Sequence, residues 1–97
     1  MIAVIATLPV KPEQREEALA AAKEMMAEVA HEEGTIEYTL NIDEEDPDTL
    51  IFIERYRDMA ALTAHSATAH FKAFMDKASE FAADAPAIRV LTELDSI

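Results

Sequence analysis

Residues 35–56, TIEYTLNIDEEDPDTLIFIERY, decide the fold that the sequence predicts. Polar and apolar side chains alternate on both sides of a short acidic segment, which is typical of two strands with one buried face. Asp-Pro-Asp at positions 46–48 has the chemistry of a turn. The inward positions of the two strands are Ile36, Tyr38, Leu40 and Ile42, followed by Leu50, Phe52, Glu54 and Tyr56. We therefore expect an antiparallel hairpin in the middle of the chain.

A strand and a helix are predicted before this hairpin. Residues 2–8 are apolar on both alternating faces and rich in branched side chains, as in a strand that is buried on both sides. Alanine, glutamate and methionine dominate residues 13–33 and favour a helix. Pro12 suits the first turn of that helix. Gly34, the only glycine in the chain, is placed to end it in a left-handed cap.

Two helices and a last strand are predicted after the hairpin. Asp58 can cap a short helix over residues 59–65, and Thr68 can cap a longer one that ends near residue 84. Residues 88–94 alternate again as a strand. The order is strand, helix, two strands, helices, strand. This is the order of an α+β, ferredoxin-like split β-α-β fold with a four-stranded antiparallel sheet.

A second apolar face of the sheet predicts a partner. Ile5, Ile51, Ile53 and Leu91 alternate with the residues expected to face the helices, so they lie on the opposite side. A chain of 97 residues buries a modest share of its surface by itself, yet 51% of these residues are hydrophobic. We therefore expect a homodimer through sheet-to-sheet packing, which gives a dimeric α+β barrel.

Charge and composition exclude several classes of function. Eight basic and twenty acidic residues give a net charge of −12, which disfavours nucleic acids and anionic membrane surfaces as partners. No apolar run is long enough to span a membrane, and residues 1–8 lack the basic leader of a signal peptide. Without cysteine there is no disulfide framework and no thiolate metal site. A single cytoplasmic domain over residues 1–97 is expected.

Several short segments resemble the antibiotic biosynthesis monooxygenase family. They are Val-Lys-Pro at 10–12, Glu-Gly-Thr-Ile-Glu-Tyr at 33–38, Glu-Arg-Tyr-Arg-Asp at 54–58, Ala-Leu-Thr-Ala-His at 61–65 and Thr-Ala-His-Phe at 68–71. The resemblance covers nearly the whole chain, and it implies the dimeric barrel and an oxygenase activity without flavin or metal. Haem-degrading members use an asparagine, a tryptophan and a histidine together. This chain has no tryptophan, and its first strand has no asparagine, which argues against haem degradation.

His65 and His70 are the candidate catalytic bases. On one continuous helix they would lie on different faces, but a break at Thr68 lets both point toward a common cavity. Histidine titrates near neutral pH and can accept a proton from a phenol, with Tyr56 as a hydrogen-bonding partner. Alternatively, histidines near helix ends only bind free backbone groups. Because both histidines lie near helix ends, we expect thermal stability to change little when His65 or His70 is replaced by alanine.

The remaining candidates concern the substrate and a metal. Phe71, Phe74 and Met75 can wall a pocket for an aromatic substrate, although their helical spacing also suits a plain core. Glu54 lies among apolar residues and can either transfer a proton or pair with Arg89. No metal is expected, since the two histidines lack the spacing of a helical zinc motif and no third ligand is indicated.

Three functions agree with these residues. The leading hypothesis is a cofactor-independent monooxygenase that oxidises a small electron-rich aromatic, a hydroquinone or a polyketide phenol, with O2. An isomerase or another small-metabolite enzyme on the same scaffold is the first alternative. A non-catalytic ligand-binding dimer is the second, because a fold alone does not specify a function.

Overall fold

The computed structural model describes residues 1–97, and its elements follow the predicted order. A single turn of 3-10 helix, Pro12–Gln14, leads into the first α-helix. None of the helices is long and apolar enough to cross a membrane. The strands and helices are β1 (Ile2–Pro9), α1 (Arg15–Val29), β2 (Thr35–Asp43), β3 (Asp46–Tyr56), α2 (Met59–Ser66), α3 (Ala69–Phe81) and β4 (Ala87–Thr92).

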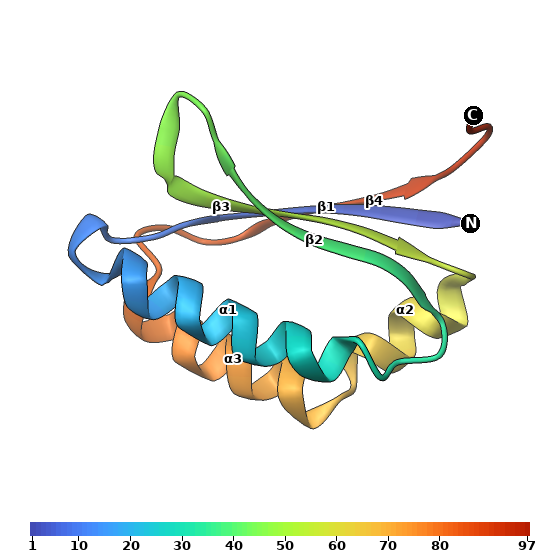
Figure 1. The fold of residues 1–97 in the computed structure, drawn as a ribbon, viewed down its shortest axis with the longest axis horizontal. Helices are drawn as coiled ribbons and strands as arrows, with labels where there is room; N and C mark the ends of the chain where they lie inside the picture. Colours follow the sequence, from blue (N-terminus) through green and yellow to red (C-terminus); the bar gives the residue numbers. More distant parts are fainter.

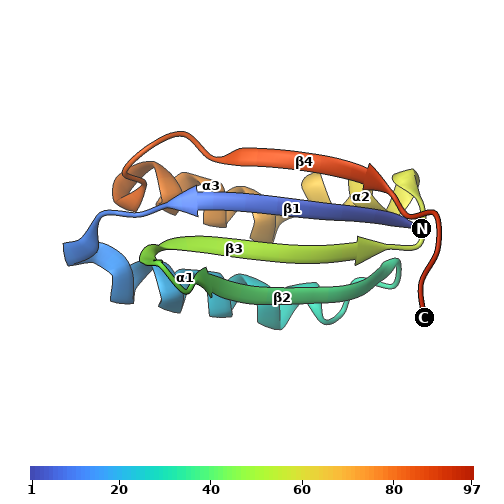
Figure 2. The ribbon, with the colours of Figure 1, turned by 90° about the horizontal axis from the view of Figure 1, so that it is seen from above.

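The four strands form one antiparallel sheet in the order β2-β3-β1-β4 (Figure 2). Helices α1 and α3 lie side by side under one face of this sheet, and α2 lies under one end of it (Figure 1). The first and last strands pair along their length, with Val4 opposite Val90. This is the ferredoxin-like α+β fold that the sequence predicted.

The main core lies between the sheet and the helices α1 and α3. Phe52 of β3 packs against Phe74 of α3 with ring centroids 5.8 Å apart, and Phe74 packs against Phe81 at 6.0 Å. Complete burial of one such aromatic side chain contributes about 1.5–3 kcal/mol to folding. Helix α1 presents the fully buried Ala18 and Ala22, which are small enough to let it pack closely. The phenylalanine side chains of the main core are therefore gathered on β3 and α3.

Two predicted caps set the directions of α2 and α3. The Asp58 carboxylate accepts a hydrogen bond of 2.9 Å from the N–H of Ala61. The Thr68 hydroxyl accepts one of 3.2 Å from the N–H of Phe71. Each such cap stabilises a helix start by about 1 kcal/mol. Because the chain breaks at Thr68, His65 ends one helix and His70 begins the next.

Gly34 does not cap α1, contrary to the sequence prediction. Helix α1 ends at Val29, and Gly34 has no positive φ. A Cβ atom at Gly34 would instead collide with the Cβ of Ala61. The carbonyl of Gly34 also accepts a hydrogen bond of 2.9 Å from the N–H of Arg57. Glycine is therefore required because α2 packs closely on the loop after α1.

The other face of the sheet carries no helix (Figure 1). Ile5 lies opposite Ile53 on β3, and Ile53 is 45% exposed. At one edge of this apolar surface, Arg55 forms ion pairs with Glu93 at 3.0 Å and with Glu37 at 3.4 Å. The second apolar sheet face that the sequence predicted is therefore present.

Candidate active site

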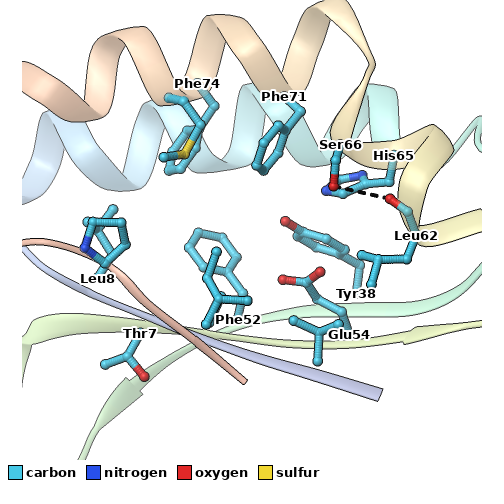
Figure 3. Close-up of a pocket in the computed structure, with 15 residues that line it drawn as sticks. Thr7, Leu8, Tyr38, Phe52, Glu54, Leu62, His65, Ser66, Phe71 and Phe74 are labelled. Carbon is cyan, nitrogen blue, oxygen red and sulfur yellow. Dashed lines mark hydrogen bonds between the residues drawn. The ribbon is translucent and has the colours of Figure 1, made fainter. Parts of the chain in front are cut away.

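A cleft lies between the sheet and the helices α2 and α3 (Figure 3). Fifteen residues line it, and ten of them are hydrophobic. Phe71, Phe74 and Met75 of α3 form one wall, and Leu8 and Phe52 of the sheet form the other. The structure thus brings the three predicted pocket residues of α3 together in one cleft.

Five of the lining side chains are polar: the hydroxyl residues Thr7 and Ser66, and the group formed by Tyr38, Glu54 and His65. Tyr38 on β2 and Glu54 on β3 lie directly opposite each other, and both point into the cleft (Figure 3). His65 lies against Tyr38 with ring centroids 5.4 Å apart. No lysine or arginine lines the cleft. The site is therefore an apolar volume with hydrogen-bonding groups at one end and no positive charge.

Glu54 is a buried carboxyl group with one polar partner. Tyr56 donates a hydrogen bond of 2.5 Å from its hydroxyl to the Glu54 carboxylate. Burial raises the pKa of Glu54 to about 7; the hydrogen bond from Tyr56 opposes this rise, and the charge of Glu32 adds to it. Near neutral pH, Glu54 is therefore present both as an acid and as a carboxylate.

Tyr56, a predicted catalytic residue, does not line the cleft. It is fully buried beside Val4 and Ala61, and its hydroxyl donates a hydrogen bond to Glu54. Burial, the hydrogen bond to Glu54 and the charge of that carboxylate all raise the pKa of Tyr56 above its ordinary value. Tyr56 therefore stays protonated, and its hydroxyl acts on the cleft through Glu54.

Glu32, in the loop between α1 and β2, joins the two candidate histidines. Its carboxylate lies 2.9 Å from Nδ1 of His65 and 2.5 Å from Nε2 of His70. Thr35 donates a third hydrogen bond of 2.8 Å from its hydroxyl. Burial alone would raise the pKa of Glu32, but these three hydrogen bonds and the charge of His65 outweigh burial and hold the pKa below its ordinary value. Glu32 is therefore an ionised carboxylate at neutral pH.

His65 is the histidine that lines the cleft. It is 2% exposed, and its Nε2 is buried without a hydrogen-bond partner. A carboxylate can only accept hydrogen bonds, so the Nδ1 that faces Glu32 must carry the hydrogen. In the neutral ring, Nε2 then carries a free lone pair. This burial also corrects the expectation of little stability change, because an alanine at position 65 would leave a cavity in the packed interior.

His70 does not share that cleft, which corrects the prediction of a common cavity. It lines a separate cleft between α1 and α3, with Glu24 and Lys77. The two rings are 6.4 Å apart by their centroids. The break at Thr68 turns both histidines toward Glu32, so they share an acceptor rather than a cavity.

Both the sequence and the fold are similar to those of known proteins. Residues 1–77 match the family described as antibiotic biosynthesis monooxygenase. A Bacillus subtilis (strain 168) protein with the name "Putative monooxygenase YcnE" is 38% identical over 94 residues, which cover 97% of this chain and 98% of that protein. The chain belongs to the antibiotic biosynthesis monooxygenase family.

Solved structures agree with this membership of the monooxygenase family. A Caulobacter crescentus protein, described as a "putative antibiotic biosynthesis monooxygenase", superposes with a TM-score of 0.93 at 32% identity, covering 97% of this chain and 90% of that one. A conserved protein from Methanosarcina mazei superposes with a TM-score of 0.92 at 30% identity, covering 96% and 92%. The resemblance found in the sequence is therefore confirmed for the family and for its fold.

Arg89 is absent from the site of this monooxygenase family member, although the sequence suggested it as a partner of Glu54. Val4 lies opposite both Glu54 and Val90, and this set faces the helices. Arg89 lies opposite Ile5, one residue further along, and therefore points to the other face of the sheet. The polar partner of Glu54 is Tyr56 and not the predicted arginine.

Two residues of the site were missed in the sequence of this family member. Glu32 lies in a loop, where no periodicity distinguishes it from the neighbouring Glu33. Tyr38 was placed correctly on an inward strand position, but only the register of β2 against β3 sets it opposite Glu54. Both depend on contacts between segments far apart in the chain.

Glu32, His65 and His70 also bring potential metal ligands together. One ligand atom from each lies within 4.8 Å of the other two, so Glu32 is a third potential ligand that the sequence did not indicate. A metal ion could bind there only if both histidine nitrogens that face Glu32 gave up the hydrogen that each donates to this carboxylate. The hydrogen-bonded cluster accounts for the geometry by itself.

Proposed function

We propose that this protein is a monooxygenase that oxidises a small electron-rich aromatic, a hydroquinone or a polycyclic phenol, with O2 and without flavin or metal. The observation that carries the proposal is His65, which lines an aromatic-walled cleft with a buried, unpartnered Nε2 and a carboxylate on its Nδ1. Membership of a monooxygenase family supports the reaction class.

The chemistry requires a base and a dry, apolar site. Nε2 of His65 takes the proton of the substrate hydroxyl, and the resulting phenolate is electron-rich enough to reduce O2. The ring carbon that reacts gains one oxygen atom from O2 and loses its hydrogen. The second oxygen atom leaves as water, with that hydrogen and the hydroxyl proton. A phenol with a free para position thus becomes a quinone, and four electrons pass from the substrate to O2.

The lining of the cleft supports a neutral aromatic substrate. Phe71, Phe74 and Met75 offer flat apolar contacts, and Tyr38 and Glu54 can bind a second oxygen of the ring. The cleft has no cationic side chain, and burial of a carboxylate beside Glu54 would be costly. We therefore propose that carboxylated aromatics are excluded.

The test is a screen of hydroquinones and polycyclic phenols with an oxygen electrode. We expect the purified protein to accelerate O2 consumption with at least one of them, with no added cofactor, after spontaneous oxidation is subtracted. If every compound gave only the spontaneous rate, the oxygenase proposal would be rejected.

An isomerase is the second candidate, and a specific feature favours it. A base, His65, and a carboxyl group with a pKa of about 7, Glu54, line the same cleft. Such a pair can remove a proton at one atom and return it at another, which is the chemistry of tautomerisation. Turnover of a tautomerising substrate with no O2 consumed would select this alternative. A non-catalytic dimer would show neither reaction.

We also propose that the protein is a homodimer in which the sheet faces that carry Ile53 pack together. An apolar sheet face without helices is unusual on a small monomer. Ile53→Asp should therefore yield a monomer. Met59→Asp is the matched control, because Met59 is also exposed (51%) but lies on α2.

Sedimentation equilibrium at micromolar concentration measures the masses of these variants. We expect twice the chain mass of 10.7 kDa for the wild type and Met59→Asp, and a single chain mass for Ile53→Asp. A wild type at 10.7 kDa would contradict the dimer.

A further inference from the structure

One carboxylate connects two histidines that lie in different clefts. Nδ1 of His65 lies 2.9 Å from Oε1 and 3.0 Å from Oε2 of Glu32, and Nε2 of His70 lies 2.5 Å from Oε2. The Thr35 hydroxyl donates to Oε1. The side chain of Glu32 is 13% exposed, while that of His65 is 2% exposed. Three hydrogen bonds therefore hold the ionised carboxylate of Glu32 in one position.

This arrangement determines where the hydrogen of each neutral imidazole lies. Since the ionised Glu32 offers no donor, His65 must carry its hydrogen on Nδ1 and His70 on Nε2. The two rings therefore hold opposite tautomers. His65 is left with a lone pair on Nε2, which is buried and has no hydrogen-bond partner, and His70 is left with a lone pair on Nδ1.

We propose that Glu32 and His70 are positioning residues for the base His65. Glu32 fixes the tautomer of His65 so that Nε2 is offered to the substrate, and His70 holds Glu32 in place. His70 is thus not a second base. The assignment of roles in catalysis rests on the proposed function, whereas the tautomer of His65 follows from the geometry and is measured separately.

The surroundings of His65 leave Glu32 as the group that selects its tautomer. Tyr38 and Tyr56 pack against the ring with centroids 5.4 and 5.5 Å away, and Phe71 lies at 5.0 Å. Neither tyrosine forms a hydrogen bond with His65, and the hydroxyl of Tyr56 donates to Glu54 instead. Glu54 lines the same cleft, and His70 reaches the ring only through Glu32. Glu32 is therefore the only hydrogen-bond partner of the ring.

A carboxylate of this kind matters because a histidine in the wrong tautomer cannot act as the base. In the serine protease triad, replacing the orienting carboxylate with an amide lowers turnover by about 10⁴-fold. There the carboxylate stays ionised and stabilises the imidazolium that forms. Glu32, whose pKa is held below its ordinary value, is suited to the same role.

The tautomer is tested by long-range ¹H–¹⁵N NMR of the imidazole rings, in a pH series that extends until the spectra show both rings neutral. We expect the wild type to show His65 with hydrogen on Nδ1 alone. Glu32→Ala removes the acceptor, so both tautomers of His65 should become populated. Glu33→Ala is the matched control, because Glu33 is the next residue, is 91% exposed at its side chain and does not contact His65.

Two NMR results would overturn the proposal. One is a wild-type His65 that carries hydrogen on Nε2. The other is a His65 tautomer that is the same in folded Glu32→Ala as in the wild type, where amide spectra confirm the fold. Neither result depends on turnover, so each is distinct from a failure of the proposed oxygenase reaction.

The role of His70 is tested by kinetics on whichever substrate the screen identifies. His70→Gln keeps an amide N–H for Glu32, so we expect it to retain most of kcat/KM. His70→Ala should lower kcat/KM roughly tenfold, because Glu32 loses one charge-assisted hydrogen bond and no longer holds His65 in a fixed orientation. If His70→Gln instead lost as much activity as His65→Ala, His70 would be a base and the assignment would be wrong.

Discussion

Replacing His65 with alanine is expected to lower turnover by on the order of 10²–10⁴-fold, the usual cost of losing a positioned base. The reason is that His65 is the only histidine that lines the cleft, and its Nε2 is the nitrogen without a partner. Turnover is measured as O2 consumption above the spontaneous rate. The effect should fall mainly on kcat, because the ring contributes little of the apolar wall that holds the substrate.

His31→Ala is the control for His65→Ala, since His31 is exposed and lies in the turn after α1. It should leave the rate unchanged. Because His65 is buried, its alanine variant also requires a fold check, and His65→Gln supplies a less disruptive companion that still lacks the base. Full activity in a folded His65→Gln would show that the base has been assigned to the wrong residue.

Glu54→Gln is expected to stabilise the protein above pH 7 by up to about 3 kcal/mol, since one unit of pKa shift corresponds to about 1.4 kcal/mol. Burial raises the pKa of Glu54 from its ordinary value of 4.5 to about 7. Below pH 4.5 the group is protonated in both the folded and the unfolded chain. As the pH rises from 4.5 to 7, the unfolded chain releases this proton first, so stability is lost. The glutamine variant does not suffer this loss.

Urea unfolding at pH 4.5 and at pH 8 measures this difference. The gain of Glu54→Gln over the wild type should be near zero at the lower pH and largest at the higher one. Glutamine can still accept the hydrogen bond from Tyr56, so the packing around the site is retained. Glu45→Gln, in the exposed hairpin loop, serves as the control and should show no pH-dependent gain. A constant difference at both pH values would contradict the raised pKa.

The fold could be predicted because its determinants are local. The alternation in residues 35–56 fixed the hairpin, and Asp58 and Thr68 carry caps whose hydrogen bonds are present in the structure. Gly34 was misread because a glycine after a helix usually marks a left-handed cap. Here the reason for glycine is the side chain of Ala61, which is distant in sequence and close in space.

The site could be predicted only in part, for the same reason. Helical spacing and the break at Thr68 placed Phe71, Phe74 and Met75 on one wall and identified His65. The sequence could not reveal that Glu32 would meet both histidines, because that contact joins a loop to two helices. Arg89 was assigned to the wrong face because a single step in register reverses the direction of a strand side chain.

The most direct test of the central claim uses ¹⁸O₂. A polycyclic phenol with a free para position is incubated with the purified protein under ¹⁸O₂ in ordinary water, and the quinone product is examined by mass spectrometry. A parallel reaction under ordinary O2 in labelled water corrects for exchange of carbonyl oxygen. We expect a product that carries one ¹⁸O atom per molecule and forms faster than in a protein-free control. A product without the label, or one that forms equally fast without O2, would contradict it.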